Sequence, residues 1–411
     1  MLKKIRVLYF SFDSGFGGPL LASQIIPHLK ELSKRDVRFY LISFESKSLS
    51  STQQKQFDIT REIFKISKAK WWPLKHIYAP RPFPSIIGIF RGILLGIYVT
   101  FRYKIDIFHG RSIVGGSITF LLSILLRKPW IFDPRILHAE AAVLSGDCRR
   151  NSLRYSVLWW LERKLSLKCN GVRVESWQHR DIYLQNHHNK KELIKKYHLI
   201  VNGVDLNTFK FNSNEVANLK EKLNIPKNVM VFVYLGTFGH GRPNKEMAMF
   251  VHMYQTLFKE AHFLILTYTN HDEVSVIMKN INLSYTIKYL PHQNIPQYLS
   301  LADAAITFND PQAYAHTMPL KFAEYLACGI PVVINKGLLN MQNIIEKYNV
   351  GVVVADFSLS SLQKASHQLH NLLQEKDIRQ RCRYPCHKEL SIEHASEQLL
   401  TLYRYVLLRN K

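Results

Sequence analysis

The chain alternates short runs of apolar, often β-branched residues with longer stretches that have helical periodicity. Each run suits a buried strand, and each stretch between runs is long enough for a helix that crosses back over a sheet. The pattern occurs in the first half of the chain and again in the second. It predicts an α/β fold of two Rossmann-like, doubly wound domains that face a central cleft. The expected strands are residues 5–12, 37–43, 105–109, 130–133, 229–235, 262–268, 285–289, 304–308, 331–334 and 351–354.

The domain boundary is expected near residues 197–211, where a turn-forming Asn-Gly pair separates a strand-like segment from a polar one. This predicts an N-terminal domain over residues 1–200 and a C-terminal domain over residues 201–388. The last segment, residues 389–411, carries one apolar stripe at helical spacing, so it must bury that stripe against something. We expect it to pack back toward the N-terminal domain.

The charge of the chain is strongly unbalanced. Its 411 residues include 55 Lys and Arg against 31 Asp and Glu, which gives 55 − 31 = +24 with histidine counted neutral. A hydrophobic fraction of 47% excludes a disordered basic tail, so the charge belongs to folded surface. It indicates a polyanionic partner, which could be nucleic acid, an anionic membrane or a phosphorylated small molecule.

The five cysteines favour reduced thiols over a disulfide framework, because they are scattered and odd in number. Cys382, Cys386 and His387 lie close together, but no second cluster completes a tetrahedral site. We therefore predict no metal site.

The longest apolar stretch, residues 85–101, is shorter than the ~20 residues of a membrane span and has Arg91 at its centre. Trp71 and Trp72 before it, and basic residues on both sides, are typical of a helix that lies in a membrane interface. A core helix of an α/β layer is the alternative. The two are compatible if one face packs on the sheet.

A glycine-rich segment, residues 13–19, follows the first predicted strand and precedes a helix. Glycines such as Gly17 and Gly18 let the backbone approach a ligand, and a helix N-terminus attracts negative charge. The segment is not GxGxxG, so it is no dinucleotide fingerprint. We expect a loop that faces a ligand, although a plain tight turn is the alternative.

Polar residues also follow two other strands. His109 and Arg111 come at the end of the strand at 105–109, which favours a place in a site over a satisfied core position. The strand at 130–133 is followed by a second polar group, which forms either one polar wall for a hydroxyl-rich ligand or an internal ion-pair cluster. Its members are Asp133, Arg135, His138 and Glu140.

Residues 315–335 give the most information about a ligand site. Thr317 is a candidate N-cap, Pro319 suits the first turn of a helix, and a buried strand follows that helix. The helix offers free N–H groups to a diphosphate, with Lys321 adding charge. Glu324 lies three residues later on nearly the same face, where it could accept hydrogen bonds from a ribose diol. An acid on an apolar helix would be costly without such a partner.

These residues resemble a known family. The string PLKFAEYLACGIPVV, residues 319–333, resembles the donor-site motif of the retaining glycosyltransferases called group 1, or family four, which have the GT-B fold. VNGVDLNTF, at 201–209, resembles the opening of the family's second domain. DIFHGRS, at 106–112, and FDPRILHAE, at 132–140, resemble its first-domain strand ends. The order matches over nearly the whole chain.

The resemblance implies a nucleotide-sugar site in the C-terminal domain and an acceptor site in the N-terminal domain. Glu324 would bind the ribose, and the amides of Thr317 and Met318, with Lys321 and Arg242, would hold the diphosphate. No cofactor or metal would be needed.

On the N-terminal side, the resemblance implies that Gly17 and Gly18 approach the phosphate or the acceptor. His109 would face the transferred sugar, and Arg111 could add a charge. Tyr268 and residues 292–298 are expected to flank the base.

Two departures from the family pattern stand out. His316 occupies the place of the family's usual Glu, which puts in doubt how the sugar hydroxyls are held. After the strand at 229–235, Thr237 stands where Arg is usual and Arg242 stands where Lys is usual. Arg242 could supply the phosphate contact, and Lys245 is the alternative.

The sequence thus predicts a glycosyltransferase for hexosyl or N-acetylhexosaminyl groups. It would use a nucleotide-sugar, of the UDP type, and a lipid-linked glycan acceptor of a surface polysaccharide or lipopolysaccharide. We expect it in the cytoplasm, peripheral on the anionic inner face of the cell membrane, without a nucleic-acid partner. A sugar-nucleotide epimerase of the same fold, a non-enzymatic basic protein that binds nucleic acid or membrane, and an inactive scaffold are the alternatives.

Overall fold

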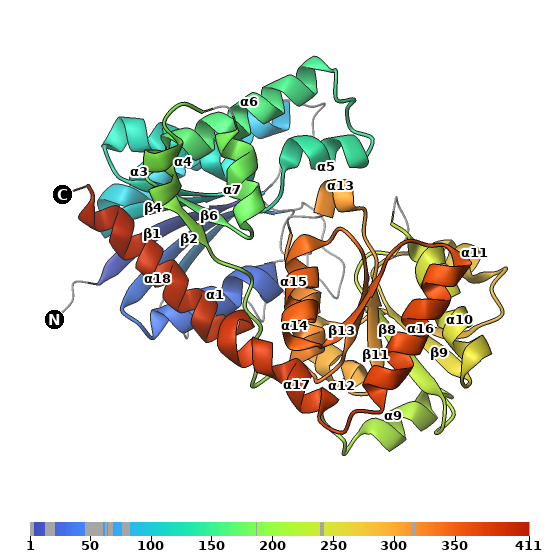
Figure 1. Ribbon diagram of the computed structural model, residues 1–411. Helices are drawn as coiled ribbons and strands as arrows, with labels where there is room; N and C mark the ends of the chain where they lie inside the picture. The colour runs from blue at the N-terminus through green and yellow to red at the C-terminus, as the bar shows by residue number, and fades with distance from the viewer. Residues whose placement is uncertain are drawn as a thin grey trace. The chain divides into compact units, whose positions relative to one another are not determined.

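The computed structural model describes residues 4–12, 21–45, 61, 64, 69–75, 83–185, 187–238, 242–314 and 317–410. The chain divides into two compact units (Figure 1). The N-terminal unit comprises Met1–Gly203 together with Ile392–Lys411, and the C-terminal unit comprises Val204–Ser391. Each unit is built on its own parallel sheet, which confirms the prediction of two Rossmann-like α/β domains.

The N-terminal unit has a seven-stranded sheet in the order β3-β2-β1-β4-β5-β6-β7. All six strand pairs are parallel. The four strands expected in this half are present, with ends that differ by up to two residues. Three short strands were not anticipated: β3, β6 and β7. The strands are β1 (Ile5–Ser11), β2 (Val37–Glu45), β3 (Lys70–Lys75), β4 (Ile107–Arg111), β5 (Trp130–Asp133), β6 (Gly171–Val174) and β7 (Tyr197–Leu199).

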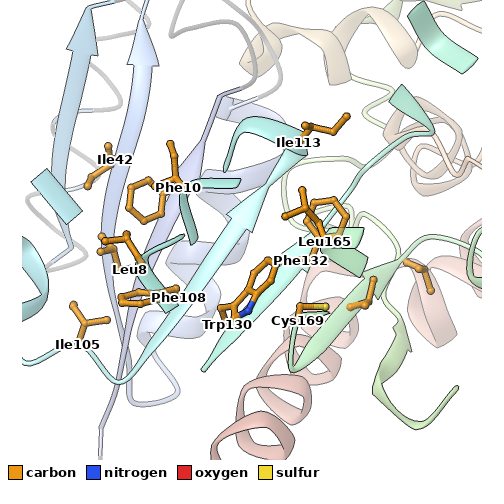
Figure 2. Close-up of a cluster of buried hydrophobic side chains, with 14 of the residues drawn as sticks. Leu8, Phe10, Ile42, Ile105, Phe108, Ile113, Trp130, Phe132, Leu165 and Cys169 are labelled. Carbon is orange, nitrogen blue, oxygen red and sulfur yellow. The ribbon is translucent and has the colours of Figure 1, made fainter. Parts of the chain in front are cut away.

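Helices cover both faces of this sheet. Figure 1 shows α3 (Phe83–Tyr103), α4 (Ser112–Leu126) and α6 (Leu153–Lys168) on one side, and α1 (Ile26–Ser33) and α18 (Ile392–Leu408) on the other. Successive side chains of a strand point to opposite faces of the sheet, so the strands contribute to a hydrophobic core on each face. The side chains facing α3, α4 and α6 include Leu8, Phe10, Phe108, Trp130 and Phe132, which Figure 2 shows in one cluster.

The opposite core lies under α1 and α18. Val7, Ile107 and Ile131 point to this side, where they meet Leu29 and the α18 stripe that includes Leu402. Tyr403 of the same stripe is fully buried. The last helix of the chain is therefore part of the N-terminal unit's core.

Trp71 and Trp72 lie in β3, at the edge of the sheet. The Trp71 indole donates a hydrogen bond of 2.9 Å to the Ser43 hydroxyl, and the Trp72 ring stacks with Tyr40 at 6.4 Å between centroids. Both tryptophans thus pack against their own sheet. Each ring is only partly buried, so the expectation that they form an aromatic flank for an interfacial helix stays a prediction.

The C-terminal unit has a six-stranded parallel sheet in the order β10-β9-β8-β11-β12-β13. All six expected strands are present here. They are β8 (Met230–Leu235), β9 (Ala261–Leu266), β10 (Ser284–Lys288), β11 (Ala304–Thr307), β12 (Val332–Asn335) and β13 (Gly351–Val354). The helices packed around this sheet include α10 (Asn244–Leu257), α14 (Leu320–Ala327) and α16 (Leu359–Leu373).

Candidate functional site

The helix α14 follows the carboxyl end of β11 and precedes β12. It begins at Leu320, with Pro319 as the N-cap residue in an extended conformation. The expectation that Thr317 caps this helix is wrong, since Thr317 lies two residues before the cap. Both its amide, at 3.2 Å, and its hydroxyl, at 3.0 Å, donate to the Tyr314 carbonyl. Tyr314 thus already uses the amide that the resemblance assigned to a diphosphate.

Lys321 lies in the first turn of α14. Its Nζ is 4.3 Å from the centroid of the Tyr234 ring. Gly236 lies next to Nζ, since a Cβ there would be 3.4 Å away, and its backbone φ of +130° favours glycine. Although part of the side chain is accessible, burial lowers the pKa of the Lys321 ammonium well below its ordinary value, and the charge of Arg242 lowers it further. Glu324 opposes that shift without reaching ion-pair distance.

The surroundings of Lys321 therefore suit an anion. Among the described residues, no carboxylate lies within ion-pair distance of its Nζ. A partly buried cation without an acidic partner is costly, and a bound phosphate would remove that cost.

Arg242 adds a second cation at the end of β8. It donates a hydrogen bond of 2.8 Å to the Asn309 side chain and lies 5.3 Å from the Tyr314 ring centroid. Thr237, the other departure from the family pattern, follows β8, where its carbonyl accepts a 2.6 Å hydrogen bond from the Tyr234 hydroxyl. Two cations, Lys321 and Arg242, thus each lie beside an aromatic ring, Tyr234 of β8 and Tyr314 respectively.

Glu324 lies one turn after Lys321 and is 3% exposed. Its Oε1 is 2.8 Å from Nε2 of His292, which is the donor when that nitrogen carries the proton. The His292 ring also contacts Phe209, at 5.3 Å between centroids. Within the described part of the chain, no hydrogen bond reaches Oε2 of Glu324. That oxygen is the one left for a ligand hydroxyl.

His292 is a residue whose role here the sequence did not reveal. It begins the short 3-10 helix η3 (His292–Asn294), 32 residues before Glu324. No local pattern links two positions so far apart. The sequence indicated only that Glu324, an acid on an apolar helix, needs some hydrogen-bond partner.

Tyr268 and Tyr289 follow β9 and β10, and their rings meet edge to face at 4.8 Å. The Tyr268 hydroxyl donates to the Leu290 carbonyl at 3.3 Å, two residues before His292. Burial raises the pKa of Tyr268 to about 12, and the charges of Tyr289 and Glu324 contribute. Tyr268 is nevertheless 39% exposed, so an aromatic face remains available beside Glu324.

The C-terminal unit therefore brings several predicted residues to one end of its sheet. Cations come from β8 and α14, a carboxylate from α14, and an aromatic face from β9. The predicted residues found here are Thr237, Arg242, Tyr268, Thr317, Met318, Lys321 and Glu324. Gly17, Gly18 and His316 lie outside the described residues.

His109 and Arg111 belong to the N-terminal unit, whereas the residues described so far belong to the C-terminal unit. His109 was expected at the end of its strand but lies inside β4, two residues before the last residue Arg111, and is fully buried. Its Nδ1 is 2.8 Å from the Tyr403 hydroxyl and its Nε2 is 3.7 Å from the Asp133 carboxylate. Burial lowers the pKa of His109, and Asp133 opposes that shift. The imidazole is thus held within the core, where burial favours its neutral form.

Arg111 belongs to a buried ionic cluster. Arg111, Arg135 and Arg173 approach Asp133, with N···O distances of 4.0, 3.9 and 3.5 Å. These arginines hold the pKa of Asp133 well below its usual range despite burial, which acts in the opposite direction. Arg135 also lies 2.7 Å from Glu175. Three cations thus share two carboxylates at the carboxyl ends of β4 to β6.

The other members of the predicted polar wall have separate partners. His138 pairs with Glu162, at 3.1 Å, and Glu140 pairs with Arg150, at 2.8 Å. The prediction that these four residues form one polar wall is therefore wrong. The alternative, an internal ion-pair cluster, describes Asp133 and Arg135. Within the described ranges, no three His, Cys, Asp or Glu side chains are grouped to hold a metal ion.

Residues 230–371 match the sequence model of the family "Glycosyl transferases group 1". That segment contains Arg242, Lys321 and Glu324. No curated protein sequence matches the chain. This part of the C-terminal unit is therefore similar to the group 1 glycosyltransferases.

Solved structures share the fold over almost the whole chain. The sucrose-phosphate synthase of Thermosynechococcus elongatus is 16% identical, with a TM-score of 0.72 over 98% of this chain and 100% of that one. The Anabaena protein Alr3699/HepE, in complex with UDP and glucose, is 12% identical, with a TM-score of 0.67 over 97% and 99%. A putative UDP-N-acetylglucosamine 2-epimerase of Listeria monocytogenes is 10% identical, with a TM-score of 0.61 over 99% and 97%.

The fold is that of GT-B glycosyltransferases, as the sequence predicted. Because an epimerase shares it, the fold alone does not distinguish sugar transfer from epimerisation. The family match of residues 230–371 favours transfer.

Proposed function

We propose that the chain is a retaining glycosyltransferase that transfers a hexosyl or N-acetylhexosaminyl group from a nucleotide-sugar, of the UDP type. The observation that carries this proposal is the ammonium of Lys321. It lies at the start of α14 without an acidic partner within ion-pair distance among the described residues, one turn before the half-satisfied carboxylate of Glu324. A cation beside a carboxylate at that spacing suits the diphosphate and the ribose of one ligand.

The leaving diphosphate develops negative charge as the bond to the sugar breaks. Lys321 and Arg242 supply positive charge at the end of β8, where the surroundings are poorly solvated and the interaction is strong. Two cationic side chains can replace a metal in this role, so we expect turnover to persist in a chelator. Oε2 of Glu324 accepts from the ribose, and Tyr268 offers a ring to the base.

Retention requires that the acceptor hydroxyl attack from the face that the diphosphate leaves. No enzymic nucleophile is needed for such a step, because the departing phosphate can take the proton. The UDP and glucose bound by the Anabaena protein of the same fold support a UDP-sugar donor.

His109 and Arg111 are proposed to serve the acceptor side. Since both are buried, His109 acts as a positioning residue within the ionic cluster. Its hydrogen bond with Tyr403 ties β4 to α18, and its proximity to Asp133 ties β4 to β5.

The acceptor is proposed to be lipid-linked, within cell-surface glycan synthesis. The enzyme would then be cytoplasmic and peripheral on the inner face of the membrane. The net charge of +24 supports this location, because the inner leaflet is anionic.

A panel of nucleoside diphosphates in a thermal-shift assay tests the donor site. We expect UDP to raise the melting temperature and Glu324→Ala to remove that shift. If no nucleotide in the panel stabilises the protein, the proposal fails. Release of free sugar-nucleotide epimer without transfer would instead identify an epimerase, and salt-dependent retention on DNA would favour a nucleic-acid partner.

A further inference from the structure

The helix α3 has its small residues inside and its large residues outside. Gly88, Gly92 and Gly96 recur every four residues on the face that meets the core. A Cβ on Gly92 would lie 2.8 Å from Cδ1 of Ile118, and a Cβ on Gly96 would lie 2.6 Å from Cδ1 of Leu122. The glycines therefore let α3 lie unusually close to α4 and the sheet.

The outer face of α3 carries an apolar stripe with the same spacing. Its members are between 53% and 71% exposed, which is the reverse of an ordinary surface helix, where the outer face is polar. They are Ile86, Phe90, Leu94, Tyr98 and Phe101. Burial in the core does not account for these side chains, so another surface must.

The stripe continues across the neighbouring helices of the same layer. The helix α3 packs on α4, and α4 packs on α6 (Figure 1). The exposed side chains of α4 are also apolar and large, namely Leu121, Ile124 and Leu125. The helix α6 exposes Leu153, Val157 and Trp160 together with the polar Arg154, Ser156 and Lys168. We call the outer surface of α3, α4 and α6 the apolar face. Scattered apolar residues are normal on a protein surface, but a patch that spans three helices marks an interaction site.

The charges of this layer indicate what the apolar face meets. Neither α3 nor α4 contains an acidic residue, and the one in α6, Glu162, is fully buried. Basic residues lie at the ends of the helices: Arg102, Lys104, Arg127, Lys128 and Lys168. An apolar surface with a predominantly basic rim complements an anionic bilayer, in which acyl chains lie beneath phosphate groups.

The helix α6 adds a groove of about 310 Å³, which also combines apolar and basic side chains. It is lined by Trp159, Trp160, Leu167 and three basic residues, which include Lys164. The Lys164 Nζ lies 4.5 Å from the Trp160 ring centroid. A tryptophan beside a lysine is typical of a side-chain pair at the level of lipid headgroups.

The helix α3 lies on the bilayer and does not cross it. Within the part of the chain that the structure describes, it is the one helix long and apolar enough to span a membrane. Its glycine face, however, is packed into the core of the N-terminal unit, and Arg91 donates a 2.8 Å hydrogen bond to the Lys75 carbonyl of β3. Crossing would require α3 to leave the sheet.

We propose that the apolar face docks on an anionic membrane, with α3 parallel to the bilayer surface and its outer stripe among the acyl chains. The basic helix ends then contact lipid phosphates. This inference deepens the membrane location in the proposed function, but the surface itself does not depend on catalysis.

The test is co-sedimentation with vesicles of phosphatidylcholine, alone or mixed equally with phosphatidylglycerol. The triple variant Phe90→Gln, Leu94→Gln, Phe101→Gln removes the stripe from positions that are already exposed. A matched control, Val276→Gln with Leu359→Gln, changes exposed apolar residues of the C-terminal unit. We expect the wild type and the control to bind mixed vesicles at low salt, and the triple variant to bind about tenfold or more weakly.

Unchanged binding of the triple variant, or no binding by the wild type, would overturn the proposal. Light scattering adds a further outcome: a wild-type dimer that the triple variant dissociates, without vesicle binding, would assign the face to a second copy. Circular dichroism checks that the variant folds. Stabilisation by UDP separates this inference from the proposed function, because the variant is expected to keep that stabilisation whether or not it binds lipid.

Discussion

The substitution Lys321→Met tests the donor site most informatively, because it should weaken ligand binding and stabilise the empty protein. Methionine keeps an unbranched, apolar side chain as far as Cε and removes the ammonium group. In the empty site, burial and the nearby Arg242 hold the pKa of Lys321 well below its ordinary value. A lysine whose folded-state pKa is depressed lowers stability at every pH below its unfolded value, so neutral pH is unfavourable for it.

The expected magnitudes follow from the contacts. A charge-assisted hydrogen bond contributes about 1.5–3 kcal/mol, so loss of the Lys321 contact should weaken UDP binding about 10- to 150-fold. Relief of the buried charge is partly offset by loss of the contact with Tyr234, whose ring lies 4.3 Å away. A net gain of about 1 kcal/mol would raise the melting temperature of a domain of this size by about 2–4 °C.

Isothermal titration of UDP in buffers with different ionisation enthalpies measures both affinity and proton exchange. A bound diphosphate raises the pKa of Lys321 again, so the wild type should take up protons on binding and Lys321→Met should take up fewer. The exposed substitution Lys364→Met, in α16, is the matched control and should change neither quantity. Binding of UDP to Lys321→Met within about twofold of the wild type would refute the reasoning.

Three further outcomes are expected. Replacing His292 with Ala removes the hydrogen bond to Glu324 and should weaken UDP more than 2′-deoxy-UDP, with Gln restoring part of the difference; equal weakening of both ligands would exclude a role toward the ribose. Burial holds the pKa of His28 and His109 below 6.5, so only the unfolded chain gains these protons as the pH falls, and the urea midpoint should be lower at pH 5.5 than at 7.5; an unchanged midpoint would contradict this. Gly110→Ala should lower the melting temperature, because its Cβ would lie 2.5 Å from a backbone oxygen of α4, and an unaltered melting curve would argue against that packing.

The sequence predicts a strand most clearly where several apolar or β-branched residues follow one another. β8, for example, is MVFVYL and is wholly buried. β3 was not anticipated because Pro73 and its tryptophans do not give a strand pattern, and it is tolerated at the sheet edge. β7 has only three residues, Tyr197–Leu199, and depends on pairing with β6. Short edge strands are specified by tertiary contacts that local sequence does not contain.

The residues of the candidate site could be predicted where they lie on the same helix. Lys321 and Glu324 share α14, so helical spacing alone places them near each other. His292 reaches Glu324 from a separate segment, and the pairing follows only from the fold. His109 was expected at the end of its strand, but β4 extends to Arg111 because it pairs with β5 as far as Asp133. That pairing keeps the imidazole in the core.

The central claim is that α14 holds a nucleotide-sugar whose ribose is bound by Glu324. Turnover of UDP-sugars by the wild type and by Glu324→Ala, measured with membrane lipids as the acceptor source, tests it most directly. We predict that the wild type transfers label from at least one UDP-sugar into lipid-extractable product and that Glu324→Ala does not. Transfer by Glu324→Ala at the wild-type rate would contradict the claim.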